Sequence, residues 1–210
     1  MEELMQSPLE LTEAAIRGAF EAQDLPRAAN EILALYGRDV LGFLVARLRN
    51  RDDGQEAYAM FSEDLWRGLR GFEFRGSARA WTYTLARNAA TRYALAKERR
   101  PARNLPLSEQ CAAVERAAAS RSATQAHLRT EVKQRMRALR DRLTSDEQTL
   151  LMLHVDRGLT FPELAEVLHG APLDKTLLDR ETPRIRKQFE RIKRKLRQLA
   201  IEEGILTDRG

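Results

Sequence analysis

The sequence predicts an all-α protein, and three of its features indicate this fold class. Glycine and proline are sparse, at 11 and 7 of 210 residues, while Ala, Leu, Glu, Arg and Lys, which favour helices, dominate. Apolar residues recur every three or four positions in several long segments. The alternation typical of strands is nearly absent. Because 43% of the residues are hydrophobic, the helices can also bury a core.

Charge and cysteine content narrow the range of functions. The formal net charge of +5 suggests a polyanionic partner, although solubility alone would also explain such a charge. The one cysteine, Cys111, excludes an internal disulfide, and His127, His154 and His169 are too scattered to form a zinc site with it. The sequence shows no targeting signal and no apolar run of about 18 residues. We therefore expect a cytoplasmic protein with no membrane insertion and no cofactor.

Three helices are predicted in the first half of the chain. Large apolar residues recur at helical spacing in residues 26–49. After a polar break at residues 50–54 a second helix follows, which Asp52 or Asp53 can cap. A third helix is expected to begin after Ser77, its N-cap. The apolar stripe of this third helix contains Ala78, Trp81, Leu85 and Ala89.

The composition changes after the third helix. Residues 97–130 are basic at first and then rich in alanine and serine, without large apolar side chains that could form a core. We interpret most of this stretch as a linker between two domains. The predicted division is an N-terminal extension (1–25), a helical bundle (26–100), a linker (101–130) and a C-terminal helix-turn-helix domain (131–204).

Two capping boxes indicate closely spaced helices in the C-terminal domain. Thr144 and Thr160 are each followed three residues later by glutamate, a pattern in which the two side chains bond each other's backbone N–H groups. Gly158 and Gly170 are placed to end the two helices. We therefore expect two short helices packed tightly together.

The last helix is expected to begin with Thr182 as its N-cap. Pro183 would then occupy the first helical position, where its missing N–H costs nothing. Residues 182–200 contain eight Lys or Arg against one Glu, so this helix alone carries +7, more than the net charge of the whole chain. The cationic excess is therefore concentrated on one helix face.

A short helix followed by a basic amphipathic helix is typical of a helix-turn-helix, whose second helix enters the major groove of DNA. Arginine and glutamine side chains can pair with base edges, and the remaining cations can hold phosphates. A solvated basic face that binds nothing is the alternative. The candidate contacts to duplex DNA are Arg184, Arg186, Lys187, Gln188, Arg191, Lys193 and Arg194.

Cations and aromatic rings are interleaved along the third predicted helix. Single-stranded DNA is held in this way, because its bases stack on rings while cations follow the backbone. For Trp81, on the apolar stripe, core packing is at least as good an explanation, and for Tyr83 and Arg87 both explanations stay open. The candidate contacts to single-stranded DNA are Arg79, Tyr83, Arg87, Asn88, Arg92, Arg99 and Arg100.

The sequence lacks the common catalytic motifs. It contains no P-loop, no G-x-G-x-x-G, no H-E-x-x-H and no G-x-S-x-G. We therefore expect no enzymatic activity. A metal-dependent nuclease built on scattered Asp and Glu residues is the remote alternative.

Several motifs carry a resemblance to a known family. They are Leu-Trp-Arg at 65–67 at a fixed distance after Asp53, Gly-Phe at 71–72, S-x-R-x-W-x-Y-x-x-A-R-N at 77–88, and the paired capping boxes of 143–170. With these motifs the chain resembles, over most of residues 26–200, small two-domain bacterial RNA polymerase sigma factors of the extracytoplasmic-function type.

The resemblance implies a division of labour between the two domains. The bundle would correspond to sigma region 2 and would melt and hold the downstream promoter element, while the C-terminal domain would correspond to region 4 and read the upstream element. The implied partners are core RNA polymerase, promoter DNA and an anti-sigma factor. The helix of residues 53–67 would contact the polymerase, through Asp53, Gln55, Glu56, Glu63 and Asp64.

The sequence departs from the family pattern in two places. Residues 59–62 read Ala-Met-Phe-Ser where such factors usually have Gln-Glu before an apolar pair, so the usual polar contact to the polymerase clamp is missing. Residues 171–183 stand where a turn of about four residues is usual, an insert of about nine. We expect a displaced recognition helix, or an extra short helix around Leu173–Asp179.

Two other functions fit the same patterns. One is a helix-turn-helix regulator in which residues 26–96 form a dimerisation bundle. The other is a sigma-like decoy that holds a partner and does not start transcription.

Overall fold

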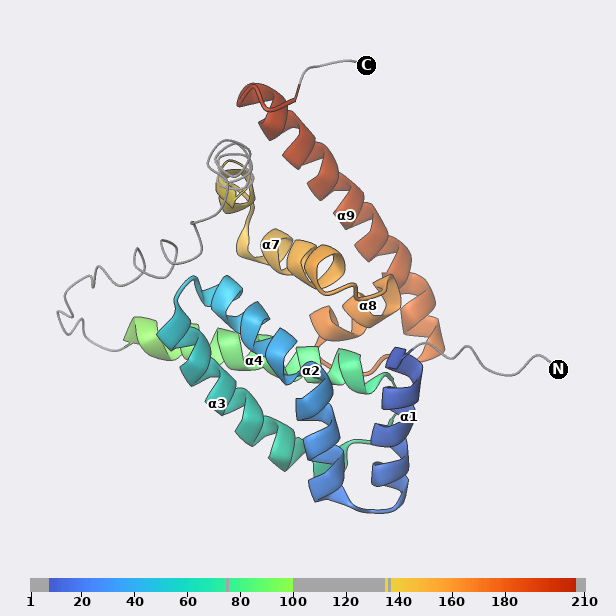
Figure 1. Cartoon of the computed structure of the whole chain (residues 1–210). Coiled ribbons are helices and arrows are strands. Elements are labelled where there is room, and N and C mark those ends of the chain that lie inside the picture. Colours follow the sequence, from blue (N-terminus) through green and yellow to red (C-terminus); the bar gives the residue numbers. More distant parts are fainter. Residues whose placement is uncertain (1–7, 75, 100–134, 136, 207–210) are drawn as a thin grey trace.

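The computed structural model describes residues 8–74, 76–99, 135 and 137–206, and the regular structure of these residues is entirely helical, as predicted. The predicted linker and Arg100 lie outside the described residues. Figure 1 shows an N-terminal bundle below and a C-terminal group of helices above it, which ends in one long helix. The bundle consists of α1 (Pro8–Glu21), α2 (Leu25–Leu48), α3 (Arg51–Gly68), the 3-10 turn η1 (Leu69–Gly71) and α4 (Ala78–Arg99), and the C-terminal half of α7 (Ser145–Leu151), the π-helical turn η2 (Met152–Asp156), α8 (Phe161–His169) and α9 (Lys175–Glu202).

The polar break between α2 and α3 is a tight reversal of the chain. Arg49 adopts the left-handed conformation (φ 56°) that ends α2, and the side chain of Asn50 accepts a hydrogen bond from the N–H of Asp53 at 3.0 Å. Asn50 is thus the cap of α3, and the prediction that Asp52 or Asp53 caps it is wrong. The two aspartates lie in the first turn, where their charges favourably oppose the helix dipole.

Helix α4 lies at the centre of the bundle and packs against α2, α3 and α8. Its buried positions are mainly small, and the hydroxyls of the buried Thr82 and Thr84 bond to carbonyls of the preceding turn. The exception is Tyr83, which is 1% exposed and packs edge-to-face on Phe43 with ring centroids 5.9 Å apart. Small side chains on several sides of α4 allow the neighbouring helices to approach closely.

The N-terminal extension contributes to the bundle, because α1 packs on α2 and buries Ile16 and Ala19. The carboxylate of Glu13 accepts hydrogen bonds from the hydroxyl of Tyr36 at 2.5 Å and from the N–H groups of Ala78 at 3.3 Å and Arg79 at 3.0 Å. One side chain of α1 therefore links α2 to the start of α4. Burial, followed by the neighbouring Glu13, raises the pKa of Tyr36 well above its ordinary value.

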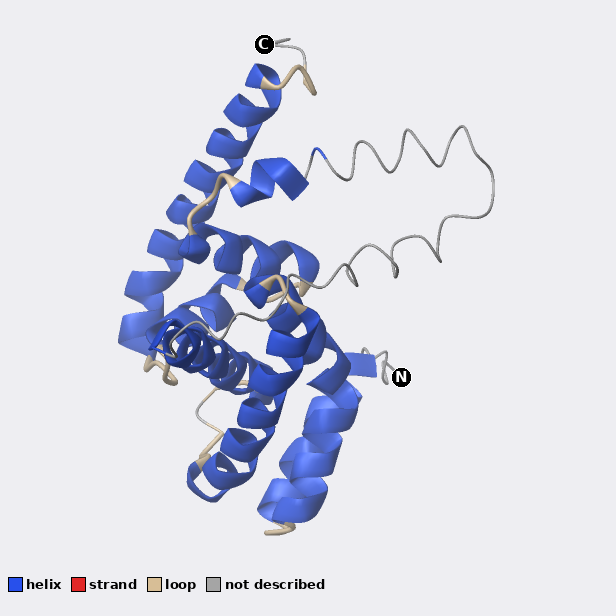
Figure 2. Ribbon diagram, turned by 90° about the vertical axis from the view of Figure 1, so that its left-hand side faces the viewer, coloured by secondary structure: helices blue, strands red, loops and turns tan. Residues whose placement is uncertain are grey.

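Both predicted capping boxes of the C-terminal half are present, at Thr144 and Thr160. Gly170 ends α8 in the left-handed conformation (φ 80°), as expected from its position. The buried core continues from the bundle into this half, since residues of α4, α8 and α9 belong to one hydrophobic cluster. Figure 2 shows the two halves stacked directly on each other.

The predicted start of the last helix is wrong. Helix α9 begins at Lys175, capped by Asp174, whose carboxylate accepts the N–H of Leu177 at 2.8 Å, and Pro183 therefore lies inside the helix. A proline there deprives the carbonyl of Asp179 of its donor. Asp179 and Pro183 are both exposed, so water can satisfy that carbonyl. Leu177 and Leu178 pack against the core and help to stabilise these additional first turns.

Replacing Glu13 with alanine tests its link between α1, α2 and α4. We expect Glu13→Ala to lower the free energy of unfolding by about 2 kcal/mol, because it leaves partly buried donors without an acceptor. Urea unfolding followed by circular dichroism measures this value. In the control Glu31→Ala, which removes an i,i+4 pair with Arg27 at 3.9 Å, the loss should stay below about 0.5 kcal/mol. Equal losses in both variants would contradict the role given to Glu13.

Candidate nucleic-acid interface

Helices α8 and α9 follow each other across a short connection, the position where a helix-turn-helix is predicted. The turn between them, residues 170–174, is short, and the residues predicted as an insert mostly form the first turns of α9 instead. In helix-turn-helix proteins the N-terminal residues of the second helix contact base edges. The arrangement therefore moves the expected base-reading positions from Arg184 and its neighbours to the start of α9.

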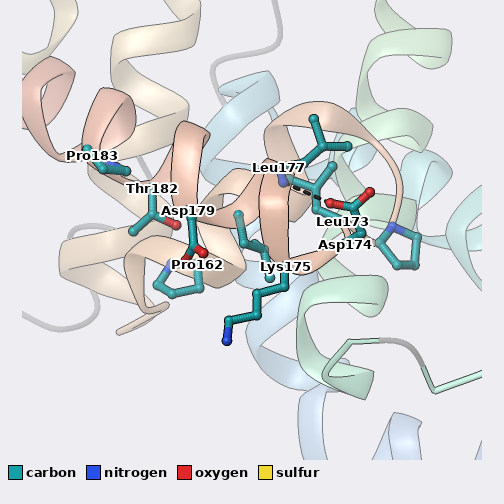
Figure 3. Close-up of a pocket in the computed structure, with 10 residues that line it drawn as sticks. Pro162, Leu173, Asp174, Lys175, Leu177, Asp179, Thr182 and Pro183 are labelled. Atoms are coloured by element: carbon teal, nitrogen blue, oxygen red, sulfur yellow. Dashed lines mark hydrogen bonds between the residues drawn. The ribbon is translucent and has the colours of Figure 1, made fainter.

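The exposed side chains at the start of α9 border a groove that faces α8. Lys175, Asp179 and Thr182 of α9 line it together with Pro162 from the first turn of α8 (Figure 3). Lys175 and Thr176 are exposed at the tip of the helix. The groove thus presents a cation, one hydroxyl group and two carboxylates at the start of α9.

The predicted basic face of α9 is present in the structure. Its apolar side, with Ile185, Phe189 and Ile192, is buried, and the cations lie on the other side. Some of them have partners: Arg184 pairs with Glu181 at 2.7 Å, and Lys193 pairs with Glu190 at 2.7 Å. The exposed pair of Lys193 with Glu190 is weak and leaves this cation available to phosphates, whereas Glu181 is only 8% exposed and also pairs with Arg180 at 2.9 Å. Of the candidates on this face, Arg184, Arg186, Lys187, Arg191, Lys193 and Arg194 are exposed and Gln188 is half-buried.

The position of α9 is held by contacts with α7, η2 and α8. Lys195 donates a hydrogen bond to the carboxylate of Glu147 at 2.7 Å, which links α9 to the start of α7. The ring of His154 packs against Phe161 and Phe189, with centroids 4.4 and 4.6 Å away. Burial alone would raise the pKa of Glu147, but hydrogen bonds from Lys195 and Thr144 outweigh it and hold the pKa below its ordinary value.

The candidate residues on α4 are divided between the core, the contact with the C-terminal half, and the surface. The prediction that Tyr83 contacts single-stranded DNA is wrong, because its ring packs in the core and cannot stack on a base in this arrangement. Burial also raises the pKa of Tyr83 to about 12. Arg79 and Arg87 are half-buried, and Arg79 donates to the carbonyls of Arg157 and Gly158. Asn88, Arg92 and Arg99 are exposed, and Arg92 pairs with Asp64.

Trp81 has two possible roles from the sequence, packing in the core or stacking on a base of single-stranded DNA. Its ring is half-buried and stacks on Phe72, with centroids 4.4 Å apart and an angle of 23° between the planes. Trp81 therefore packs on the bundle, as its place on the apolar stripe of α4 favoured.

The candidate polymerase contacts on α3 also differ in their exposure and in their hydrogen bonds to α4. Gln55, Glu56 and Glu63 are exposed. Asp53 accepts hydrogen bonds from the hydroxyl of Tyr93 at 2.7 Å and from Lys97 at 2.5 Å, so it ties α3 to α4. Asp64 has the same role through Arg92.

The sequence interpretation missed Trp66, which is 52% exposed on α3. The sequence signals for it are its place in the Leu-Trp-Arg motif at 65–67 and its position beside the apolar stripe that contains Phe61 and Leu65. An exposed tryptophan on a helix is a frequent feature of protein-protein contacts.

Neither a metal site nor a membrane span emerges from the described residues. No group of three or more His, Cys, Asp or Glu side chains among them could hold a metal ion, and none of the described helices is long and apolar enough to cross a membrane. In comparisons with known proteins, no family model matches the chain and no curated protein matches it significantly.

A pH-dependent stability difference tests the link between α7 and α9. Glu147→Gln keeps the size of the side chain and removes its charge, and we expect it to lower the free energy of unfolding at neutral pH by about 1 kcal/mol. Because the pKa of Glu147 is lower in the folded state, this contribution is present above its unfolded pKa of about 4.5 and is lost as the pH falls through the folded value.

Urea unfolding of both proteins at neutral pH and at about pH 3 measures the difference. The two proteins should become nearly equal in acid. The control is Glu190→Gln, which removes an exposed pair with Lys193 within α9 and should change little at either pH. A difference between wild type and Glu147→Gln that persists in acid would show that the charge is not its cause.

Proposed function

We propose that the protein is a sigma-type promoter-recognition factor, a non-catalytic cytoplasmic subunit that directs core RNA polymerase to promoter DNA. The observation that carries this proposal is the exposed basic face of α9, presented directly after the short turn that follows α8. A helix placed in this way fits the major groove. The motif at residues 77–88 and the family resemblance add the bundle's proposed role at the downstream element.

In the proposed complex the two ends of α9 have different tasks. Arg194 lies about 28 Å along the helix axis from Lys175 at 1.5 Å per residue. In a helix-turn-helix the N-terminal residues of the second helix contact base edges, so we expect only this end of α9 to read them. In the proposed complex Lys175, Thr176, Asp179 and Arg180 read the upstream element, and the cations from Arg184 to Arg194 contact phosphates.

The exposed end of α4 supplies the proposed contact to the downstream element. Asn88, Arg92 and Arg99 are accessible there, followed by Arg100 in the sequence. In the proposed role this end holds the separated strand through phosphate contacts and through bases that stack on arginine guanidinium planes. No cofactor is required for this process, because binding energy drives strand separation.

The polymerase contact is proposed on the exposed face of α3. Gln55, Glu56 and Glu63 provide its polar groups, and Trp66 adds apolar area close to Glu63 on the helix. Ala59 is exposed on this helix, at the segment where related factors usually carry a polar contact. This difference favours the decoy as the second candidate function, and the resemblance implies an anti-sigma factor as a further partner.

Run-off transcription with core polymerase on a library of genomic promoters tests the proposal. We expect specific transcripts that depend on the added protein, and we expect the protein to co-elute with core polymerase.

Trp66→Ala should weaken the affinity for core polymerase at least ten-fold, since truncating a central aromatic contact typically costs about 2 kcal/mol or more. The matched control Leu95→Ala removes another large exposed apolar side chain, 48% exposed on α4. Polymerase binding without any transcript would support the decoy instead.

Two arginine substitutions on α9 test the division of the helix. Arg180→Ala should relax base preference at one position of the upstream element, at a cost of about 1–3 kcal/mol for the preferred base. Arg194→Ala should weaken binding to all duplexes alike and reduce the slope of the salt dependence by about one. Fluorescence anisotropy with a set of duplexes at several salt concentrations distinguishes these effects. A uniform loss in both variants would contradict base reading by the start of α9.

A further inference from the structure

Four arginines of the N-terminal bundle lie at or beside its contact with the C-terminal half. Arg47 donates to the backbone carbonyl of Ser145 at 3.2 Å and to its hydroxyl, and Arg49 bonds Asp141 at 2.8 Å and Gln148 at 3.3 Å. Arg79 donates to two backbone carbonyls of the turn after η2. The fourth, Arg87, lies close enough to Arg47 to influence its charge. We refer to the three half-buried ones, Arg47, Arg79 and Arg87, as the covered arginines; the side chain of Arg49 is 54% exposed.

The groups that contact the covered arginines are hydrogen-bond acceptors of the kind that DNA offers. Carbonyl and hydroxyl oxygens of residues 145–158 accept the N–H groups of Arg47 and Arg79, and a carboxylate and an amide oxygen accept those of Arg49 beside them. Phosphate oxygens of a nucleic-acid backbone bind guanidinium groups in the same way, and more strongly than neutral acceptors do. The C-terminal half thus occupies the positions that phosphates would take on this surface.

The covered arginines are incompletely satisfied in this arrangement. The Nε atoms of Arg47 and Arg87 are buried without a hydrogen-bond partner among the described residues. Burial lowers the pKa of Arg47, and the nearby Arg87 lowers it further, while Asp146 opposes the shift. Buried guanidinium groups with unpaired donors are costly, so a polyanion that reached them would gain binding energy.

Other contacts between the two halves do not involve the covered arginines. Arg157 of the C-terminal half pairs with Asp39 of α2 at 2.9 Å, and Ser77 donates to Glu163 of α8 at 2.9 Å. The side chain of Arg157 is 21% exposed and that of Asp39 is 58% exposed, so the pair lies at the edge of the contact. These contacts stabilise the packed arrangement without being part of the arginine surface.

We propose that the covered arginines are a further nucleic-acid backbone site, and that the C-terminal half and single-stranded DNA compete for it. In the packed arrangement the site is closed, while the exposed basic face of α9 and the end of α4 stay accessible to DNA. Separation of the halves opens the site. That the competing polyanion is single-stranded DNA rests on the proposed function. The competition itself rests on the contacts between the two halves.

A charge-neutral double variant tests the competition. Asp141→Arg with Arg157→Glu turns two attractive pairs between the halves, with Arg49 and Asp39, into repulsive ones while the net charge stays the same. The control exchanges Arg140 and Asp156, an ion pair at 2.9 Å inside the C-terminal half, as Arg140→Glu with Asp156→Arg. Small-angle scattering of the full chain reports separation of the halves, and anisotropy of a short fluorescein-labelled single strand reports affinity.

We expect the test variant to expand and to bind the single strand at least five-fold more tightly, the range of coupling usual between linked equilibria. The control should match the wild type in both measurements. Further substitution of Arg47 and Arg87 by alanine in the test variant should abolish the gain.

Expansion without tighter binding would overturn the proposal. If the test variant stays packed, the complex of the wild-type protein with the single strand is measured instead. A strand that crosslinks to the helix segment around Arg87 while the halves remain packed would overturn the proposal. Expansion of the protein on binding the strand would support the proposal. Failure of the proposed function is seen separately, as the absence of any polymerase-dependent transcript in wild type and test variant alike.

Discussion

The carboxylate of Glu13 fixes the start of α4, and the arrangement of the other helices depends on α4. Two backbone N–H groups at the first turn of α4 donate to this carboxylate, and the hydroxyl of Ser77 serves a third, that of Ala80. These donors have no partner within their own helix. Because Tyr36 donates to the same carboxylate, α1, α2 and α4 meet at one point. Helix α4 then contacts α2 and α3 within the bundle and α8 outside it.

Features that depend on neighbouring residues could be predicted from the sequence. The capping boxes at Thr144 and Thr160 and the end of α8 at Gly170 need only groups a few residues apart, and all are present. The start of α3 shows the limit of such reasoning, because Asn50 and the two aspartates after it can all act as caps. The left-handed conformation of Arg49 decides the choice, since it ends α2 and leaves Asn50 extended at the cap position.

Features that depend on distant packing could not be predicted in the same way. Thr182-Pro183 is a good start for a helix in isolation, but Leu177 and Leu178 pack on the core and extend α9 beyond it. On α4 the buried residues are small and lie on several sides, so periodicity does not show which side faces inward. The burial of Tyr83 could not be predicted for that reason. The basic face of α9 followed from the sequence, whereas the position of its reading end required the structure.

The two basic surfaces of the protein are coupled through α8. One side of this helix packs on α9 and the other on α4. In the proposed complex the helix that precedes the recognition helix crosses the DNA backbone. An upstream duplex bound to α9 therefore lies next to α8, and a polymerase that holds the two promoter elements apart must also draw α8 away from α4. Separation of the halves would then uncover Arg79 and Arg87, so in the proposed complex the single-strand site opens when the polymerase holds the two halves apart.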